Sequence, residues 1–184
     1  MIIVVEGVDC TGKGSVCSRL AAALGAVLMK TPPECMKEEQ ERINATTSDA
    51  EHYDYFTRVV QAASAELRAM TEPRKVVIDR YWLTTVVYHR AMGLDVALED
   101  MGDILLSDFT VYLEVSPEVQ AIRMAGRGMS NGDIRMQHRQ QLLRRLYDEE
   151  LFDQPNVIRV ETSDLSIDEV VAAILYHLPL ARLS

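Results

Sequence analysis

The sequence predicts an α/β fold in which a five-stranded parallel sheet is flanked by helices on both faces. Three features support this prediction: short apolar runs alternate with helical stretches, a Gly-rich turn follows the first run, and a charged pair closes the third. This alternation is typical of βαβ units, whose strands are parallel and buried. The 184 residues suffice for one core, and we expect residues 1–184 to form a single domain.

The predicted strands are short runs rich in β-branched and apolar residues. The first, residues 2–5, lacks polar alternation and therefore suits a strand that is buried on both faces. Pro32 and Pro33 interrupt the second run, because proline cannot continue a central strand. The other strands are expected at residues 26–29, 75–78, 110–115 and 157–160.

The predicted helices fill the intervals between these strands, and several carry end signals. Gly25 would end the first helix, and Ser116 followed by Pro117 is typical of a helix start. Ser166 and Glu169 have the spacing of a capping box. Helices are expected at residues 14–24, 35–45, 49–71, 82–92, from 117, 135–151 and 166–178, with a mobile lid at about 126–135.

Composition excludes several classes of protein. The net charge of −9 and the pI near 4.9 disfavour nucleic-acid binding, although basic residues gather at 123–145 without interleaved aromatics. This run is either a nucleic-acid contact or a phosphate-binding lid, and we favour the lid. No apolar stretch is long enough for a membrane span, and residues 1–7 do not resemble a signal peptide, so we expect a cytoplasmic protein. Three cysteines without paired spacing favour neither a disulfide framework nor a zinc site.

Residues 7–13, Gly-Val-Asp-Cys-Thr-Gly-Lys, match the phosphate-binding pattern G-x-x-x-x-G-K. Gly7 and Gly12 allow backbone N–H groups to turn around an anion, and Lys13 supplies a positive charge to phosphate oxygens. Cys10 and Thr11 lie within the same loop. Because a predicted strand precedes the motif and a predicted helix follows it, we expect a site for ATP.

The residue after Lys13 departs from this pattern. A Ser or Thr hydroxyl that binds Mg²⁺ is expected there, but the chain has Gly14 followed by Ser15. Either Ser15 takes over as a metal ligand, or water fills the position, or the loop is degenerate.

Longer motifs resemble the thymidylate kinase family of nucleoside monophosphate kinases. The family's EGxDGxGK corresponds to residues 6–13, its DRYxxSxxAYQ to residues 79–89, and its YLxVxPExxxxR to residues 112–123. Residues 161–163 are similar to the family's adenine-side loop, so Thr162 and Arg123 are expected at the ATP site. The matches occur in order over nearly the whole chain.

The resemblance implies a role for each matching residue. Asp9 would face the acceptor sugar or a cation, and Arg80 would bridge the acceptor and donor phosphates. Tyr88 would favour deoxyribose, and Thr85 would face the acceptor base. Arg127 would close over the ATP phosphates, and Asp79 would hold Mg²⁺ through water or orient Arg80. Lys13, Arg80, Arg127 and Asp9 are thus the expected catalytic residues, consistent with phosphoryl transfer being driven by positioning and positive charge.

Departures from the family gather at the acceptor pocket. Pro32 is expected there, but the glycines that usually follow it are absent. Phe56 and Arg58 lie in the region of the family's base-contacting residues with a different spacing, and His89 replaces the usual Gln. We assign Phe56 and Arg58 to the acceptor site on this basis.

The resulting hypothesis is transfer of the γ-phosphate of Mg-ATP to a (deoxy)nucleoside monophosphate, most simply dTMP, by a protein that would also form a homodimer as the family often does. A deoxynucleoside or other small-molecule kinase on the same scaffold is the first alternative. A degenerate nucleotide-binding protein, prompted by Gly14, is the second.

Overall fold

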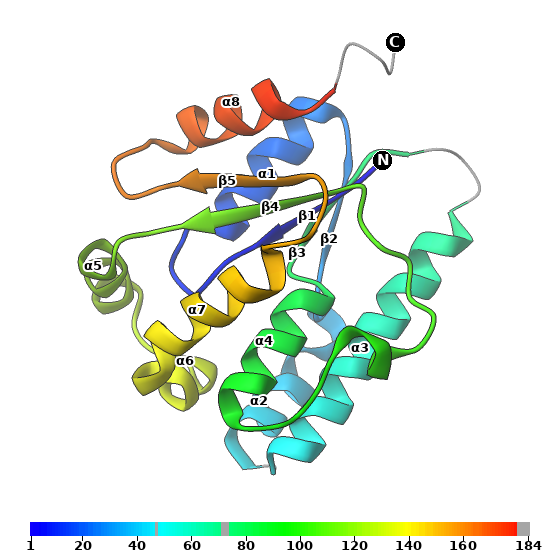
Figure 1. Ribbon diagram of the computed structural model, residues 1–184, viewed down its shortest axis with the longest axis vertical. Coiled ribbons are helices and arrows are strands. Elements are labelled where there is room, and N and C mark those ends of the chain that lie inside the picture. Colours follow the sequence, from blue (N-terminus) through cyan, green and yellow to red (C-terminus); the bar gives the residue numbers. More distant parts are fainter. Residues whose placement is uncertain (47, 71–73, 180–184) are drawn as a thin grey trace.

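A computed structural model describes residues 1–46, 48–70 and 74–179 of the chain. Five parallel strands form one sheet in the order β2-β3-β1-β4-β5, with helices on both faces (Figure 1). This confirms the fold class that the sequence predicts. The strands are β1 (Ile2–Glu6), β2 (Val27–Lys30), β3 (Val76–Asp79), β4 (Phe109–Glu114) and β5 (Val157–Glu161).

Each strand lies within one residue of its predicted bounds, and the three central strands, β3, β1 and β4, are largely buried between the two helical layers. The helices are α1 (Lys13–Leu24), α2 (Lys37–Thr46), α3 (Asp49–Ala69), α4 (Trp82–Met92), α5 (Pro117–Arg127), α6 (Asn131–Met136), α7 (Gln140–Leu151) and α8 (Ile167–His177). Short 3-10 turns occupy Glu34–Met36, Leu98–Met101 and Gln137–Arg139. Helix α3 ends at Ala69 with Met70 as its cap, and the expected end at residue 71 lies outside the described residues.

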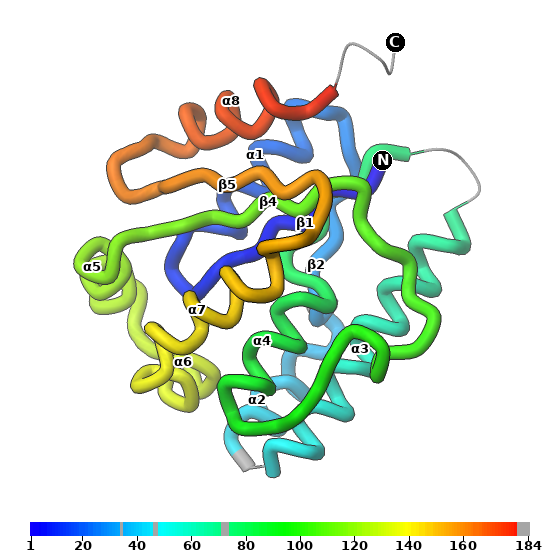
Figure 2. Tube along the Cα trace, viewed as in Figure 1, coloured from blue at the N-terminus to red at the C-terminus, as the bar shows by residue number. Residues whose placement is uncertain are grey.

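Two apolar cores cover the two faces of the sheet. Ile3 and Val5 of β1 point toward α1 and α8, whereas Val4 between them packs with α3, α4 and α7. This alternation follows from the two-residue repeat of a strand. The path of the chain in Figure 2 shows α1 and α8 on one side of the strands and α4 and α7 on the other.

The predicted helix start signals are confirmed. Ser116 accepts a hydrogen bond from the N–H of Val119, and Pro117 occupies the first helical turn. Ser166 and Glu169 form the predicted capping box of α8. Such caps stabilise a helix by about 1 kcal/mol each.

The region between residues 126 and 151 differs from the prediction. One helix was expected at 135–151, but the structure has α6, a 3-10 turn and α7, so residues 131–134 of the expected loop are helical. The physical reason is a capping box: Ser130 and Asp133 exchange hydrogen bonds and start α6. Only residues 128–130 separate α5 from α6. From here on "the lid" means residues 126–136.

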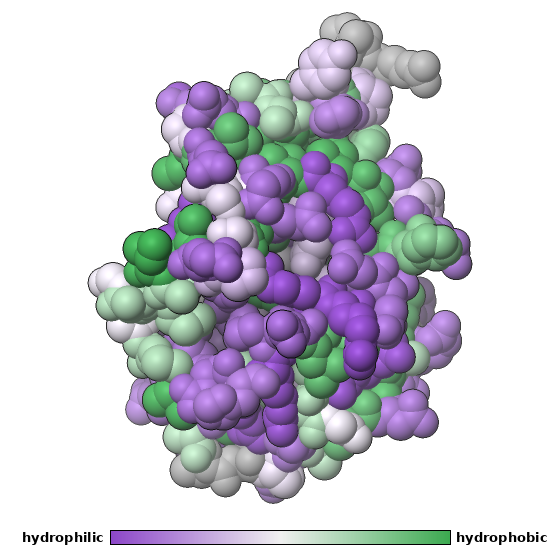
Figure 3. Space-filling model, turned by 60° about the vertical axis from the view of Figure 1, so that its left-hand side comes forward, coloured by the Kyte–Doolittle hydropathy of each residue, from purple (hydrophilic) through white to green (hydrophobic). Residues whose placement is uncertain are grey.

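Among the described residues, no helix is long and apolar enough to cross a membrane. The face shown in Figure 3 is largely hydrophilic, with hydrophobic residues scattered between polar ones.

Candidate active site

The phosphate-binding loop follows β1, at the carboxyl end of the central strand of the sheet. Gly7 is required there because a Cβ on it would lie 2.5 Å from the carbonyl oxygen of Leu113, and its φ is +145°. Gly12 has φ +90° and directly precedes α1. The loop therefore turns tightly and ends at a helix N-terminus, an arrangement that favours anions.

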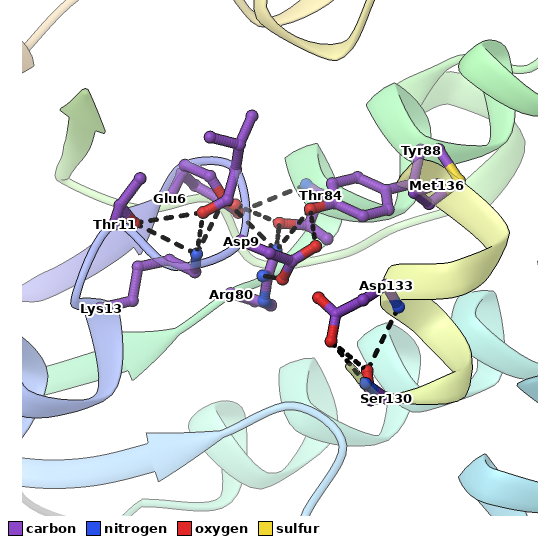
Figure 4. A network of polar contacts seen from close by, with 12 residues as sticks. Glu6, Asp9, Thr11, Lys13, Arg80, Thr84, Tyr88, Ser130, Asp133 and Met136 are labelled. Carbon is purple, nitrogen blue, oxygen red and sulfur yellow. Dashed lines mark hydrogen bonds and ion pairs between the residues drawn. The ribbon is translucent and has the colours of Figure 1, made fainter. Parts of the chain in front are cut away.

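The amino group of Lys13 lies inside this loop. Its Nζ donates to the carbonyl oxygens of Gly7 (2.9 Å) and Val8 (2.6 Å) and contacts Thr11 Oγ1 at 3.3 Å (Figure 4). Burial, assisted by the charge of Arg80, lowers the pKa of Lys13 to about 8. The loop thus holds a positive charge beside the N-terminus of α1.

Arg123 and Thr162 close the loop from the side of β5. Arg123 donates to the carbonyl oxygens of Thr162 (2.7 Å) and Cys10 (3.4 Å), and Thr162 Oγ1 donates to Thr11 O at 3.2 Å. The two residues therefore contact the phosphate-binding loop, and their predicted role at the ATP site stays a prediction.

Arg80 lies at the end of β3, next to the loop because β3 pairs with β1. It forms an ion pair with Asp9, and Tyr88 donates a hydrogen bond of 2.8 Å to the other carboxylate oxygen of Asp9. The backbone of Arg80 has φ +66°, and the carbonyl oxygen of Arg80 accepts a hydrogen bond of 2.7 Å from Thr31 Oγ1. Burial opposes ionisation of Asp9, but the charges of Arg80 and Lys13 outweigh it and lower its pKa. The pair therefore stays ionised at neutral pH.

A cavity opens beside Asp9 and Arg80, between α3, α4, α2 and the lid. Among the predicted acceptor residues, Pro32, Phe56, Thr85 and Tyr88 line it, whereas Arg58 does not. Arg58 is exposed on α3 and donates to the carbonyl of Asp54 one turn away. The structure therefore does not bring Arg58 to the cavity with the other predicted acceptor residues.

Gly14 and Ser15 are placed differently with respect to Asp79. A Cβ on Gly14 would lie 3.6 Å from Asp79 Oδ2, so position 14 faces the carboxylate. Ser15 is exposed and lines a surface depression with Arg19 and Asp168. Successive residues of a helix are rotated by about 100° about its axis, so Ser15 lies on a different side of α1 from position 14. This placement argues against Ser15 as a substitute ligand for Mg²⁺, and Asp79 remains the candidate ligand.

Arg127 lies on the lid and forms an ion pair of 2.5 Å with Asp133, which is 2% exposed at its side chain. Asp133 also accepts from the N–H and hydroxyl of Ser130, at 2.8 and 2.6 Å. Figure 4 shows Asp133 facing Asp9 and Arg80 from the lid. Arg127 and Asp133 both line the cavity, so the lid closes one side of it.

Several site residues were missed at the sequence level. Glu6 is fully buried and accepts from the N–H of Tyr81 (2.9 Å) and from Thr84, which ties β1 to the start of α4, and burial raises its pKa. Gln120 donates to the carbonyl of Asp9 at 2.8 Å. Glu6 is the first residue of the motif at residues 6–13, although no role was predicted for it, whereas Gln120 gave no signal.

Comparisons with known proteins agree with this geometry. The model of the family described as Thymidylate kinase matches residues 5–174. A protein named probable thymidylate kinase from Archaeoglobus fulgidus is 29% identical over 143 residues, which are 70% of this chain and 71% of that protein. The thymidylate kinase of Arabidopsis thaliana is 30% identical over 135 residues, 66% of this chain and 51% of that protein.

The fold also matches a solved structure of thymidylate kinase from Candida albicans. The TM-score is 0.80 at 20% identity, and the match covers 98% of this chain and 92% of the other. A match to the family over most of the chain, with the phosphate-binding loop and Arg80 side by side, identifies the activity class. The chain belongs to the thymidylate kinase family, and it is a nucleoside monophosphate kinase.

Proposed function

We propose that this chain transfers the γ-phosphate of ATP to dTMP, with Mg²⁺. The observation that carries the proposal is the position of Arg80, whose guanidinium lies between the phosphate-binding loop and the cavity and contacts Gly7 O at 3.4 Å and Asp9. A planar guanidinium with several donors suits two phosphates that must approach each other.

Lys13 and the backbone of residues 7–13 would hold the β- and γ-phosphates, and Arg123 and Thr162 would border the adenine side. The other predicted ATP-binding residues of this region would contribute backbone groups rather than side-chain chemistry; they are Gly7, Cys10, Thr11, Gly12 and Gly14. Lys13 would leave the carbonyls of Gly7 and Val8 when a phosphate offers stronger acceptors. In this way its charge would reach the transferring group without a change of the loop.

The donor set fits a magnesium ion only in part. Asp79 supplies a carboxylate beside the loop, but position 14 has no hydroxyl. Mg²⁺, when bound, would neutralise charge on the phosphates, and it commonly retains several waters. Asp79 would therefore hold it through one carboxylate oxygen or through water, with water in place of the missing hydroxyl.

The acceptor would lie with its base between Phe56 and Thr85, near Pro32, and its phosphate toward Arg80. Tyr88, held by Asp9, would lie against the 2′ side of the sugar and disfavour a ribose hydroxyl. Arg127 would leave Asp133 for the ATP phosphates when the lid closes and excludes water. Lys13, Arg80, Arg127 and Asp9 are the catalytic residues in this proposal.

The test is a coupled ADP-release assay with Mg-ATP against dTMP, dUMP, dCMP, dAMP, dGMP and thymidine. We expect turnover on dTMP, and we expect Lys13→Ala to abolish it while the circular dichroism spectrum stays unchanged. Turnover on thymidine but on none of the monophosphates would instead support a deoxynucleoside kinase. A fully active Lys13→Ala variant would exclude the assigned phosphate-binding site.

We also propose a cytoplasmic homodimer made of single-domain chains, on the basis of the family resemblance. Helix α3 is long enough to serve as an interface between two chains, although its buried residues pack into the core of the same chain. Light scattering coupled to size exclusion decides this: a mass of one chain at micromolar concentration would exclude a stable dimer.

A further inference from the structure

The side-chain amide of Gln120 connects the phosphate-binding loop with the lid through hydrogen bonds. Gln120 lies in the first turn of α5 and is 4% exposed. Its Nε2 donates to the carbonyl oxygen of Asp9 and to Oε1 of Gln140, both at 2.8 Å. Gln140 Nε2 donates in turn to the carbonyl oxygen of Met136, the last residue of the lid, at 3.1 Å. Two amide side chains therefore join the loop to the end of the lid.

The partners of Gln120 fix which way round its amide lies. The guanidinium of Arg144 can only donate, and it donates to Gln120 Oε1 and, at 2.6 Å, to the carbonyl oxygen of Val115. The carbonyl oxygen of Asp9 can only accept, so it requires the NH₂ end of the amide. With the amide reversed, two donors would face each other at Arg144 and two acceptors would face each other at Asp9. Gln120 therefore donates to the loop.

The carbonyl of Asp9 belongs to the peptide that precedes Cys10, a residue with an unusual backbone. Cys10 has φ +63°, in the left-handed region that residues other than glycine rarely adopt. Arg123, three positions after Gln120 on α5, donates to the carbonyl oxygen of Cys10 itself at 3.4 Å. Residues three apart lie on the same face of a helix. This face of α5 therefore holds the carbonyl oxygens on both sides of the Cα of Cys10, and such contacts allow a disfavoured conformation to persist.

The hydrogen bond to the Asp9 carbonyl also sets the direction of the next N–H group. The peptide between Asp9 and Cys10 is trans, and in a planar trans peptide the N–H points opposite to the C=O. The N–H of Cys10 therefore points away from Gln120. Within the part of the chain that the structure describes, no group accepts a hydrogen bond from this N–H. An N–H without a protein acceptor in a phosphate-binding loop is available to a phosphate oxygen.

We propose that Gln120 is a positioning residue of the phosphate-binding loop, which keeps the N–H of Cys10 turned toward a phosphate of the bound nucleotide. The inference rests on the proposed binding of ATP at residues 7–13. Gln120 itself does not touch the nucleotide in this proposal, because its amide acts through the peptide between Asp9 and Cys10. In the family pattern YLxVxPExxxxR, position 120 is one of the variable positions, so the role follows from contacts of this chain.

The first experiment observes the Cys10 amide directly. The chain has three cysteines, so ¹⁵N-cysteine labelling gives three amide signals, and the variants Cys17→Ala and Cys35→Ser identify the Cys10 signal by elimination. On saturation with ADP we expect this signal to move downfield in the wild type, because the N–H then donates to a phosphate oxygen. In Gln120→Met the downfield shift should be smaller. A wild-type Cys10 signal that ADP does not move, or equal shifts in both proteins, would overturn the role of Gln120.

The second experiment measures the dissociation constant of ADP by calorimetry. Gln120→Met keeps the length of the side chain but removes its hydrogen bonds, so we expect ADP to bind about tenfold more weakly, the value of one hydrogen bond. Gln61→Met is the matched control, because the amide of Gln61 also donates to a carbonyl oxygen, that of Met101 at 3.0 Å, but does not line the cavity. It should bind ADP as the wild type does. Wild-type ADP affinity in Gln120→Met would overturn the proposal.

Gln120→Glu separates the positioning role from a contribution to folding. The carboxylate still accepts from Arg144, so we expect a folded protein with a cooperative melting transition. An ionised carboxylate cannot donate to the carbonyl of Asp9, so the downfield shift of the Cys10 signal should again be reduced. If Gln120→Met did not fold, Gln120→Glu would decide the question by itself. A folded Gln120→Glu variant with the full wild-type shift would overturn the proposal.

Binding of ADP does not depend on the identity of the acceptor. If the wild type bound ADP but turned over no monophosphate, the proposed function would fail, and both measurements would still decide the role of Gln120. If dTMP were turned over but the Cys10 signal did not respond to ADP, only the role of Gln120 would fail. The two failures are therefore distinguishable.

Discussion

Asp9 of the phosphate-binding loop and Arg80 at the end of β3 form an ion pair beside the cavity between α2, α3, α4 and the lid, at a separation of 71 positions in the chain. The pairing of β1 with β3 brings them together, since parallel neighbours end at the same edge of the sheet. Each residue depends on the other, because an unpaired charge that is largely withdrawn from water is costly, and the two side chains are only 20% and 17% exposed.

Loss of the Arg80 guanidinium should slow the chemical step. Arg80→Met keeps the length of the side chain but removes the charge, so we expect kcat to fall on the order of 10²- to 10³-fold. Steady-state kinetics with both nucleotides measure this. Arg58→Met is the matched control and should retain wild-type kcat, because Arg58 is exposed and outside the cavity. Equal losses in both variants would contradict the assignment.

Lys13 should give ATP use a pH dependence. Its pKa is lowered to about 8 by burial and by Arg80, so the free enzyme loses this charge as the pH rises above about 8. We expect kcat/KM for ATP to fall above that pH, by up to about tenfold per unit. Lys13→Arg, which stays charged, should show lower activity without this fall. A wild-type profile that is flat to pH 9.5 would contradict the prediction.

The lid arginine should act on turnover more than on acceptor binding. Arg127→Ala removes a charge that would reach the ATP phosphates, and we expect kcat to fall on the order of 10²-fold with acceptor KM little changed. Arg145→Ala is the control, since Arg145 is 69% exposed on α7 and pairs with Glu149. A loss confined to acceptor KM would place Arg127 at the acceptor instead.

Restoring the missing hydroxyl should strengthen magnesium binding. In Gly14→Ser the new Cβ lies at an ordinary contact distance from Asp79 Oδ2, 3.6 Å, so the residue fits without strain. We expect half-maximal activity at a severalfold lower Mg²⁺ concentration, because the hydroxyl adds a ligand beside the carboxylate.

Ser15→Ala provides the opposite control for this experiment. Ser15 is exposed and lies away from Asp79, so its removal should leave the Mg²⁺ dependence unchanged. A weaker Mg²⁺ response in Ser15→Ala would restore Ser15 as the ligand.

The two buried histidines, His52 and His89, should make the free energy of unfolding fall at acid pH. Their folded pKa values, about 3 and about 4, lie below the ordinary 6.5, so the unfolded chain binds more protons between these limits. Stability is therefore full above pH 6.5 and falls as the pH drops toward 4, by up to about 1.4 kcal/mol per pH unit for each histidine. Urea unfolding at pH 7, 6 and 5 measures this slope.

The double variant His52→Gln/His89→Gln should show a flatter dependence in that window, whatever its stability at pH 7. His177→Gln should keep the wild-type slope, because His177 is exposed on α8. A wild-type unfolding free energy that is constant from pH 7 to pH 5 would contradict the lowered pKa values of His52 and His89.

The sequence by itself determined the sheet, the phosphate-binding loop and the family. Strands buried on both faces give uninterrupted apolar runs, and a loop that binds phosphate through its backbone requires Gly7 and Gly12 at fixed spacing. These features are local in the chain, so they can be read without a structure.

Only the tertiary structure decided which side chains meet. The direction of Arg58, the separation of Ser15 from Asp79, and the meeting of Asn44 with His52 and His89 depend on helix rotation and on contacts between distant elements. A hydrogen bond requires atoms within about 3 Å, whereas spacing in sequence fixes only the face of one element. The sequence therefore determined the phosphate-binding loop, whereas tertiary packing decided which side chains line the cavity beside it.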